Sequence, residues 1–235
     1  RAPSDPGQPK PRVLLTGFEP DEQSQLIKAA EALGFAVVDD KDADSCTHCV
    51  VNSPVKRTVK LCIALSTAQH LVTPAWLEQC KEAGTVVPEA DHLLKGTHES
   101  APGAAHPWSF DPVAAMRAGR GPCLEGSSFY LAPGIKPDAK ELGRVIAAAG
   151  GAVINRRALA SAEGKVYMVI PDSAKQEVRS VRGGRGQWKT PFSLLTRVRM
   201  RVPQDSANPP TISTHTVLLA ALRQQSIDQV LQEEP

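Results

Sequence analysis

The sequence predicts an α/β protein built from two copies of one module, each with a small parallel sheet. Short apolar strands alternate with helical patterns over residues 12–83 in the order β-α-β-β-α-β-α, which favours a parallel sheet with helices on both faces. The pattern then recurs: residues 26–38 (LIKAAEALGFAVV) match residues 142–154 (LGRVIAAAGGAVI) without a gap, and Gly34 falls on Gly150.

The first copy begins with a strand over residues 12–15 that Thr16-Gly17 ends. Helical spacing over residues 25–33 stops at Gly34, a natural C-cap. Further strands are expected at residues 35–38, 47–51 and 71–72. A last helix starts at Thr73-Pro74 and carries Trp76, Leu77 and Cys80.

A helix with an unusual charge pattern follows residue 52. Ser53 is the expected N-cap and Pro54 the first helical residue, because proline lacks only an N–H that would be unpaired there. The apolar face of this helix is formed by Val55, Val59, Cys62 and Ile63.

Three cations, Lys56, Arg57 and Lys60, occupy its first two turns, and no Asp or Glu lies between Asp44 and Glu78. A helix N-terminus carries partial positive charge, so cations there are unfavourable unless an anion binds. The pattern fits a phosphate site or a solvated basic face that binds nothing specific.

The second copy repeats the strands at residues 128–134 and 165–170 and the strand and helix at residues 212–221. A linker helix is expected from about Asp111. The predicted domains are a disordered linker (1–11), a first repeat (12–95), an inter-repeat linker (96–126) and a second repeat (127–235). An insert over residues 171–210 holds Arg179, Arg182 and Arg185, which indicate a flexible loop more than a nucleic-acid contact.

Composition limits the function classes. The net charge of +2 over 235 residues argues against a general polyanion binder, so phosphate recognition would be local. Five cysteines without framework spacing fit a reducing compartment, and no apolar run is long enough to span a bilayer. Because the chain does not begin with Met, we expect it to be a piece of a longer protein.

These motifs resemble the tandem BRCT family. The resemblance is carried by VLLTGFEP, KRTVKLCIAL, LVTPAWLEQC and YLAPGIKP and covers residues 12 to about 229. It is looser in the second repeat, where Val217 replaces the usual Trp. The resemblance implies two repeats packed head to tail, each a four-stranded parallel sheet flanked by helices. It also implies a nuclear phosphopeptide-binding module of the DNA damage response.

In this family the first repeat holds a phosphoserine or phosphothreonine. The resemblance assigns this role to the Thr16 hydroxyl, the Gly17 backbone N–H and the Lys60 ammonium group. Two directional donors and one point charge are chemically suited to a phosphate. The second repeat has Ala132-Pro133 at the equivalent place, without a hydroxyl, and is expected to be phosphate-blind.

The resemblance also implies a peptide groove. Arg57, expected one turn before Lys60 on the same helical face, would meet the third residue after the phosphoresidue and pair with a free C-terminal carboxylate. The opposing wall would come from Pro137 and from the last helix, with His215 and Leu219. A lone His at this place is more typical of a surface or capping residue. The implied partner is the phosphorylated tail of the variant H2A histone.

Two other functions stay open: DNA-end or nucleotide binding, and a phosphorylation-independent interaction scaffold. Catalysis and a cofactor are not expected, because no Ser/His/Asp or Cys/His order stands out. The run Cys46-Thr47-His48-Cys49 invites a zinc interpretation, but no second pair of ligands has suitable spacing and the run matches a buried strand. We therefore expect no metal at this run of residues. We also expect no membrane contact and no direct nucleic-acid binding.

Overall fold

The computed structural model describes residues 10–118, 122–159, 162, 164–171 and 210–233. The chain divides into two compact units, residues 1–121 with 221–225 and residues 122–220 with 226–235. The segment containing Arg179, Arg182 and Arg185 lies outside the described residues. Among the described residues, no helix combines the length and apolar character needed to cross a bilayer.

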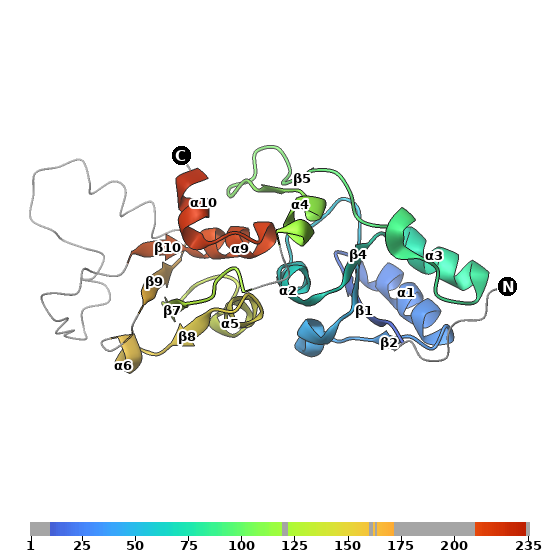
Figure 1. Cartoon of the computed structure of the whole chain (residues 1–235), viewed down its shortest axis with the longest axis horizontal. Coiled ribbons are helices and arrows are strands. Elements are labelled where there is room, and N and C mark those ends of the chain that lie inside the picture. Colours follow the sequence, from blue (N-terminus) through green and yellow to red (C-terminus); the bar gives the residue numbers. More distant parts are fainter. Residues whose placement is uncertain (1–9, 119–121, 160–161, 163, 172–209, 234–235) are drawn as a thin grey trace, which may run out of the picture. The chain divides into compact units, whose positions relative to one another are not determined.

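The first unit contains a parallel four-stranded sheet in the order β2-β1-β3-β4 (Figure 1). Its strands are β1 (Arg12–Thr16), β2 (Ala36–Val37), β3 (His48–Val51) and β4 (His70–Val72). The helices are α1 (Pro20–Ala32), α2 (Val59–Thr67) and α3 (Pro74–Ala83), with short 3-10 turns η1 (Asp40–Ser45) and η2 (Glu89–Asp91). The predicted α/β class, parallel sheet and element order are confirmed.

Alternation along the strands divides the core of this unit. Val13 and Leu15 point to the face where α1 and α3 lie and pack there with Ala30, Trp76 and Leu77. Leu14 and Cys49 alternate with them and are buried toward the opposite face, where α2 contacts β1 and β3. Both faces of the sheet are therefore covered, as expected for a parallel sheet.

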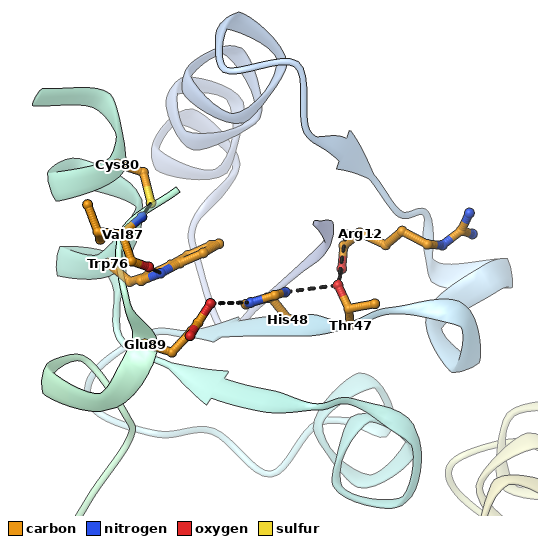
Figure 2. A network of polar contacts seen from close by, with 7 residues as sticks. All are labelled: Arg12, Thr47, His48, Trp76, Cys80, Val87 and Glu89. Atoms are coloured by element: carbon orange, nitrogen blue, oxygen red, sulfur yellow. Dashed lines mark hydrogen bonds and ion pairs between the residues drawn. The ribbon is translucent and has the colours of Figure 1, made fainter. Parts of the chain in front are cut away.

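Trp76 anchors α3 to this sheet. Its side chain is fully buried, and its Nε1–H donates a hydrogen bond of 3.1 Å to the Val87 carbonyl (Figure 2). The indole stacks on Phe35, with ring centroids 5.7 Å apart, and on His48, at 4.6 Å. One side chain thus joins the last helix, the central strand and the segment after the helix.

The helix expected from Ser53-Pro54 begins five residues later. Residues 53–58 are not helical, and Thr58 is the N-cap: its hydroxyl accepts a 3.0 Å hydrogen bond from the Leu61 N–H. The predicted start was therefore wrong. Thr58 satisfies a helical N–H directly, whereas Val55 enters the core from the preceding extended segment.

The chain between the repeats contains an antiparallel hairpin, β5 (His98–Glu99) with β6 (Ser109–Phe110), which the sequence did not predict. It is followed by α4 (Pro112–Arg117), the expected helix. Asp111 caps α4, because its Oδ1 accepts hydrogen bonds from the N–H groups of Val113 and Ala114.

The second unit repeats the sheet in the order β10-β9-β7-β8, all parallel. Gly34 and Gly150, paired by the repeat, have positive φ angles of 72° and 81° after their helices, where side chains are disfavoured. The elements of this unit are β7 (Ser127–Leu131), α5 (Ala139–Ala148), β8 (Ala152–Ile154), α6 (Arg156–Leu159), β9 (Lys165–Ile170), β10 (Thr211–Ser213), most of α9 (Thr214–Arg223) and α10 (Ile227–Glu233).

Candidate phosphate-binding site

Thr16 and Gly17 lie where β1 ends, at the carboxyl edge of the first sheet. Gly17 has a φ of 87°, and a Cβ added there would lie 3.4 Å from the Asn52 Cβ. Asn52 holds this turn, because its backbone N–H donates to the Thr16 carbonyl at 3.1 Å and its Nδ2 donates to the Gly17 carbonyl at 3.3 Å. Within the described ranges, the Gly17 N–H has no hydrogen-bond acceptor. It remains available to an anion.

A hydrogen-bonded pair of hydroxyls connects this turn to the start of α2. The Thr16 and Thr58 Oγ1 atoms are 2.6 Å apart, and Thr58 Oγ1 also accepts the Leu61 N–H. Thr16 is buried, and when Thr58 donates to it, the proton of the Thr16 hydroxyl is left for another acceptor. Thr58 was not among the site residues predicted from the sequence. The signal that could have indicated it is that threonine is a favoured N-cap residue, here three positions before Leu61.

Lys60 is the second residue of α2, two positions after Thr58, the residue whose hydroxyl contacts Thr16. Its ammonium group forms an ion pair of 2.8 Å with Asp40 Oδ1 at the start of η1. The Lys60 side chain is 22% exposed and that of Asp40 is 73% exposed. The acid that neutralises this cation therefore comes from twenty residues upstream and faces solvent.

The neighbouring cations also differ from expectation. Lys56 pairs with Glu19 at 3.0 Å, and Arg57 precedes the N-cap of α2. The prediction that Arg57 and Lys60 share one helical face was wrong, because Arg57 lies outside the helix. The inference that no acid relieves these cations was wrong too, since Glu19 and Asp40 come from distant parts of the sequence.

The corresponding turn in the second unit is built differently. The Ala132 N–H donates to the Val169 carbonyl at 2.9 Å, and Pro133 has no N–H. Neither residue carries a hydroxyl, and the one backbone N–H of this pair, that of Ala132, is already hydrogen-bonded. Pro137 is half-buried, and His215 and Leu219 are buried. Their assignment to a peptide groove stays a prediction.

Four of the five cysteines are buried as core residues are: Cys46, Cys49, Cys62 and Cys80. Burial raises the pKa of the Cys46 thiol to about 11 and that of Cys62 to about 12, and burial also raises the pKa of Cys49. These thiols are protonated at neutral pH and are poor nucleophiles, because the thiolate is the reactive form.

Comparison with known proteins finds a family model and relatives that match part of this chain. Residues 1–94 match the family model "Regulator of Ty1 transposition protein 107 BRCT domain". The chain is 37% identical to PAX-interacting protein 1 of Bos taurus over 148 residues, which is 63% of this chain and 14% of that protein. It is 28% identical to human mediator of DNA damage checkpoint protein 1 over 142 residues, 60% of this chain and 6% of that protein.

Solved structures share the fold. The BRCT5-BRCT6 domains of S. pombe Brc1 superpose with a TM-score of 0.55 at 16% identity, covering 92% of this chain and 94% of theirs. The complex of Rtt107p and phosphorylated histone H2A superposes with a TM-score of 0.51 at 10% identity, covering 92% and 88%.

The chain spans only a small part of the curated relatives that it matches. Those relatives include a DNA damage checkpoint protein, and none of their names is that of an enzyme. The matched family model covers the whole of the first sheet, its helices and the Thr16–Thr58 pair. Residues 1–94 therefore match a BRCT domain, and the chain has the fold of solved tandem BRCT pairs.

Proposed function

We propose that the first unit binds a phosphorylated serine or threonine in a partner protein. The observation that carries the proposal is the 2.6 Å contact between Thr16 and Thr58, which couples a strand-end hydroxyl to the start of a helix. In this proposal the Gly17 N–H, the Thr16 hydroxyl and the Lys60 ammonium group supply donors of three kinds to the phosphate. The Rtt107p structure with phosphorylated histone H2A supports this assignment, because it has the same fold.

The exposed Asp40 carboxylate has a defined part in this mechanism. Asp40 pairs with the Lys60 ammonium group before the ligand binds, so the phosphate has to compete with this carboxylate for Lys60. A dianionic phosphate offers Lys60 more charge than one carboxylate does, and Asp40 regains water when it is displaced.

The ligand that we propose is a phosphoserine close to a free C-terminus, as in the phosphorylated tail of the variant H2A histone. The binding would take place in the nucleus. A pull-down from an unbiased phosphopeptide library tests the choice of ligand. We expect enrichment of phosphopeptides that end three residues after the phosphoserine. If internal phosphopeptides are enriched instead, the phosphate site stands but the specificity for a C-terminal tail is wrong. Recovery of peptides without any preference for phosphate would contradict the proposal.

Arg57 is the residue that we expect to recognise the terminal carboxylate. Its guanidinium group can form a bidentate pair of hydrogen bonds with a carboxylate, which a neutral C-terminal amide cannot reproduce. Amidating the peptide C-terminus should weaken binding to the wild type by about 1–2 kcal/mol. The penalty should largely vanish in Arg57→Ala, because both changes remove the same interaction.

The measurement is a double-mutant cycle that combines the wild type and Arg57→Ala with free-acid and amidated phosphopeptides. Calorimetry gives the affinity of each combination. Lys56→Ala is the matched control, since it removes a neighbouring cation that pairs with Glu19. The amidation penalty should persist in Lys56→Ala. A coupling energy near zero for Arg57 would end the case for carboxylate recognition while leaving the phosphate site in place.

A further inference from the structure

A second cluster of polar side chains lies in the first unit, at η2 and the paired strands β3 and β4. His48 and His70 are direct partners in the parallel register of these strands, and their rings stack with centroids 4.9 Å apart. Glu89 comes from η2 and places its Oε1 3.2 Å from His48 Nε2 (Figure 2). One potential ligand atom from each of the three residues lies within 4.8 Å of the other two.

We propose that His48, His70 and Glu89 bind a divalent transition-metal ion of the zinc type. Two imidazole nitrogens and one carboxylate oxygen form a ligand set that zinc accepts, with a fourth position left to water. Imidazole ligands disfavour Ca²⁺ and Mg²⁺, which prefer oxygen. The site would therefore select for zinc and its neighbours in the transition series.

The geometry requires a modest closure of the site. Ligand atoms around tetrahedral zinc are about 3.4 Å apart, given bonds of about 2.0–2.2 Å. The His48 side chain is only 8% exposed and is held by stacking on Trp76, with an angle of 9° between the ring planes. His70 is half-buried and the Glu89 side chain is 24% exposed, so these two can rotate toward a fixed His48.

Thr47 supplies the outer hydrogen bond that a metal-binding histidine uses. Its Oγ1 lies 2.8 Å from His48 Nδ1, accepts the Arg12 backbone N–H at 2.9 Å and lies 3.4 Å from the Arg12 carbonyl oxygen (Figure 2). When the Thr47 proton is directed to that carbonyl, Thr47 accepts the His48 Nδ1–H. The free electron pair of His48 is then on Nε2, facing Glu89, and a cation between them removes their repulsion.

This site differs from a zinc site built on Cys46-Thr47-His48-Cys49. Cys49 follows His48 on β3 and points to the opposite face of the sheet. The ligands that accompany His48 are 22 and 41 residues away in the sequence, and only strand pairing and the η2 turn bring them together.

The test is calorimetric titration of ZnCl₂ into the tag-free, chelator-treated chain, with thermal melting of the same samples. We expect one Zn²⁺ per chain and a melting temperature that rises with zinc concentration, since only the folded state assembles the ligands. His70→Gln and Glu89→Gln should each weaken zinc binding at least about tenfold, and Thr47→Val by about tenfold. The visible spectrum of bound Co²⁺ reports whether the coordination is tetrahedral.

His106→Gln is the matched control, because His106 is an exposed histidine outside the cluster. It should bind zinc as the wild type does. Circular dichroism confirms that each variant is folded, and the two ligand variants are independent of each other. Equal zinc affinity in the wild type, His70→Gln and Glu89→Gln, or no zinc binding by the wild type, would overturn the proposal and leave His48–Glu89 as a plain hydrogen bond.

Discussion

Replacing Lys60 by alanine is expected to weaken phosphopeptide binding by roughly 2–4 kcal/mol. The substitution removes the only charged donor that we assign to the phosphate and leaves Thr16 and Gly17 to bind a partly desolvated dianion. Lys60 is half-buried at the start of α2, and the core contacts of this helix come from other residues, among them Leu61, Cys62 and Leu65, so the fold should survive. Calorimetry with a phosphoserine peptide measures the loss.

The ion pair with Asp40 suggests a second substitution whose expected effect on phosphopeptide affinity is opposite to that of Lys60→Ala. Asp40→Asn removes a carboxylate that competes for Lys60, and the change should strengthen phosphopeptide binding by about 0.5–1 kcal/mol, a typical value for an exposed pair. In the Lys60→Ala background the same change should have almost no effect. Wild-type affinity in a folded Lys60→Ala variant would remove Lys60 from the site.

Replacing Trp76 by alanine is expected to destabilise the first unit by roughly 3–5 kcal/mol. The change leaves a cavity at the centre of the core shared by α1, α3 and the sheet, and it removes the hydrogen bond to the Val87 carbonyl. Phosphopeptide binding should be lost only to the extent that the unit unfolds. Urea denaturation followed by circular dichroism measures the free energy of unfolding.

Two other variants make this prediction specific. Trp76→Phe keeps an aromatic ring against Phe35 and His48 but lacks the indole N–H, so its cost should be clearly smaller. Trp108→Ala removes a half-buried tryptophan from the neighbourhood of the β5–β6 hairpin and should cost less than Trp76→Ala. A Trp76→Ala variant as stable as the wild type would show that α3 is not anchored as described.

Much of the fold followed from local patterns. Each predicted strand overlaps an observed one, because short apolar runs between turn residues are hard to bury in any other way. The gap-free repeat located α5 and β8 from α1 and β2. α1 starts at Pro20, earlier than predicted, where a proline and the acids Asp21 and Glu22 were available as start signals.

The start of α2 shows where local signals conflict. Ser53-Pro54 and Thr58 are both acceptable starts by sequence. The choice depends on the Thr58 hydroxyl, which caps Leu61 and contacts Thr16, a residue 42 positions away. A rule that weighs only neighbouring residues has no access to that second contact.

The charges could not be paired from the sequence for the same reason. Lys56 and Lys60 have no acid nearby in the chain, yet Glu19 and Asp40 reach them once the sheet has formed. The hairpin and α10 were missed because the hairpin strands are only two residues long, and because α10 has seven residues and follows α9 after a short turn. The cluster of His48, His70 and Glu89 likewise exists only through strand register and the position of η2.

One calorimetric experiment tests the central claim most directly: titration of the wild-type chain with a phosphoserine peptide, its unphosphorylated twin and a DNA duplex. We predict one phosphopeptide bound per chain and at least about hundredfold weaker binding of the unphosphorylated peptide, a difference of about 2.7 kcal/mol. The DNA duplex should not compete with the phosphopeptide. Equal affinity for the two peptides, or tighter binding of DNA, would contradict phosphopeptide recognition by this unit.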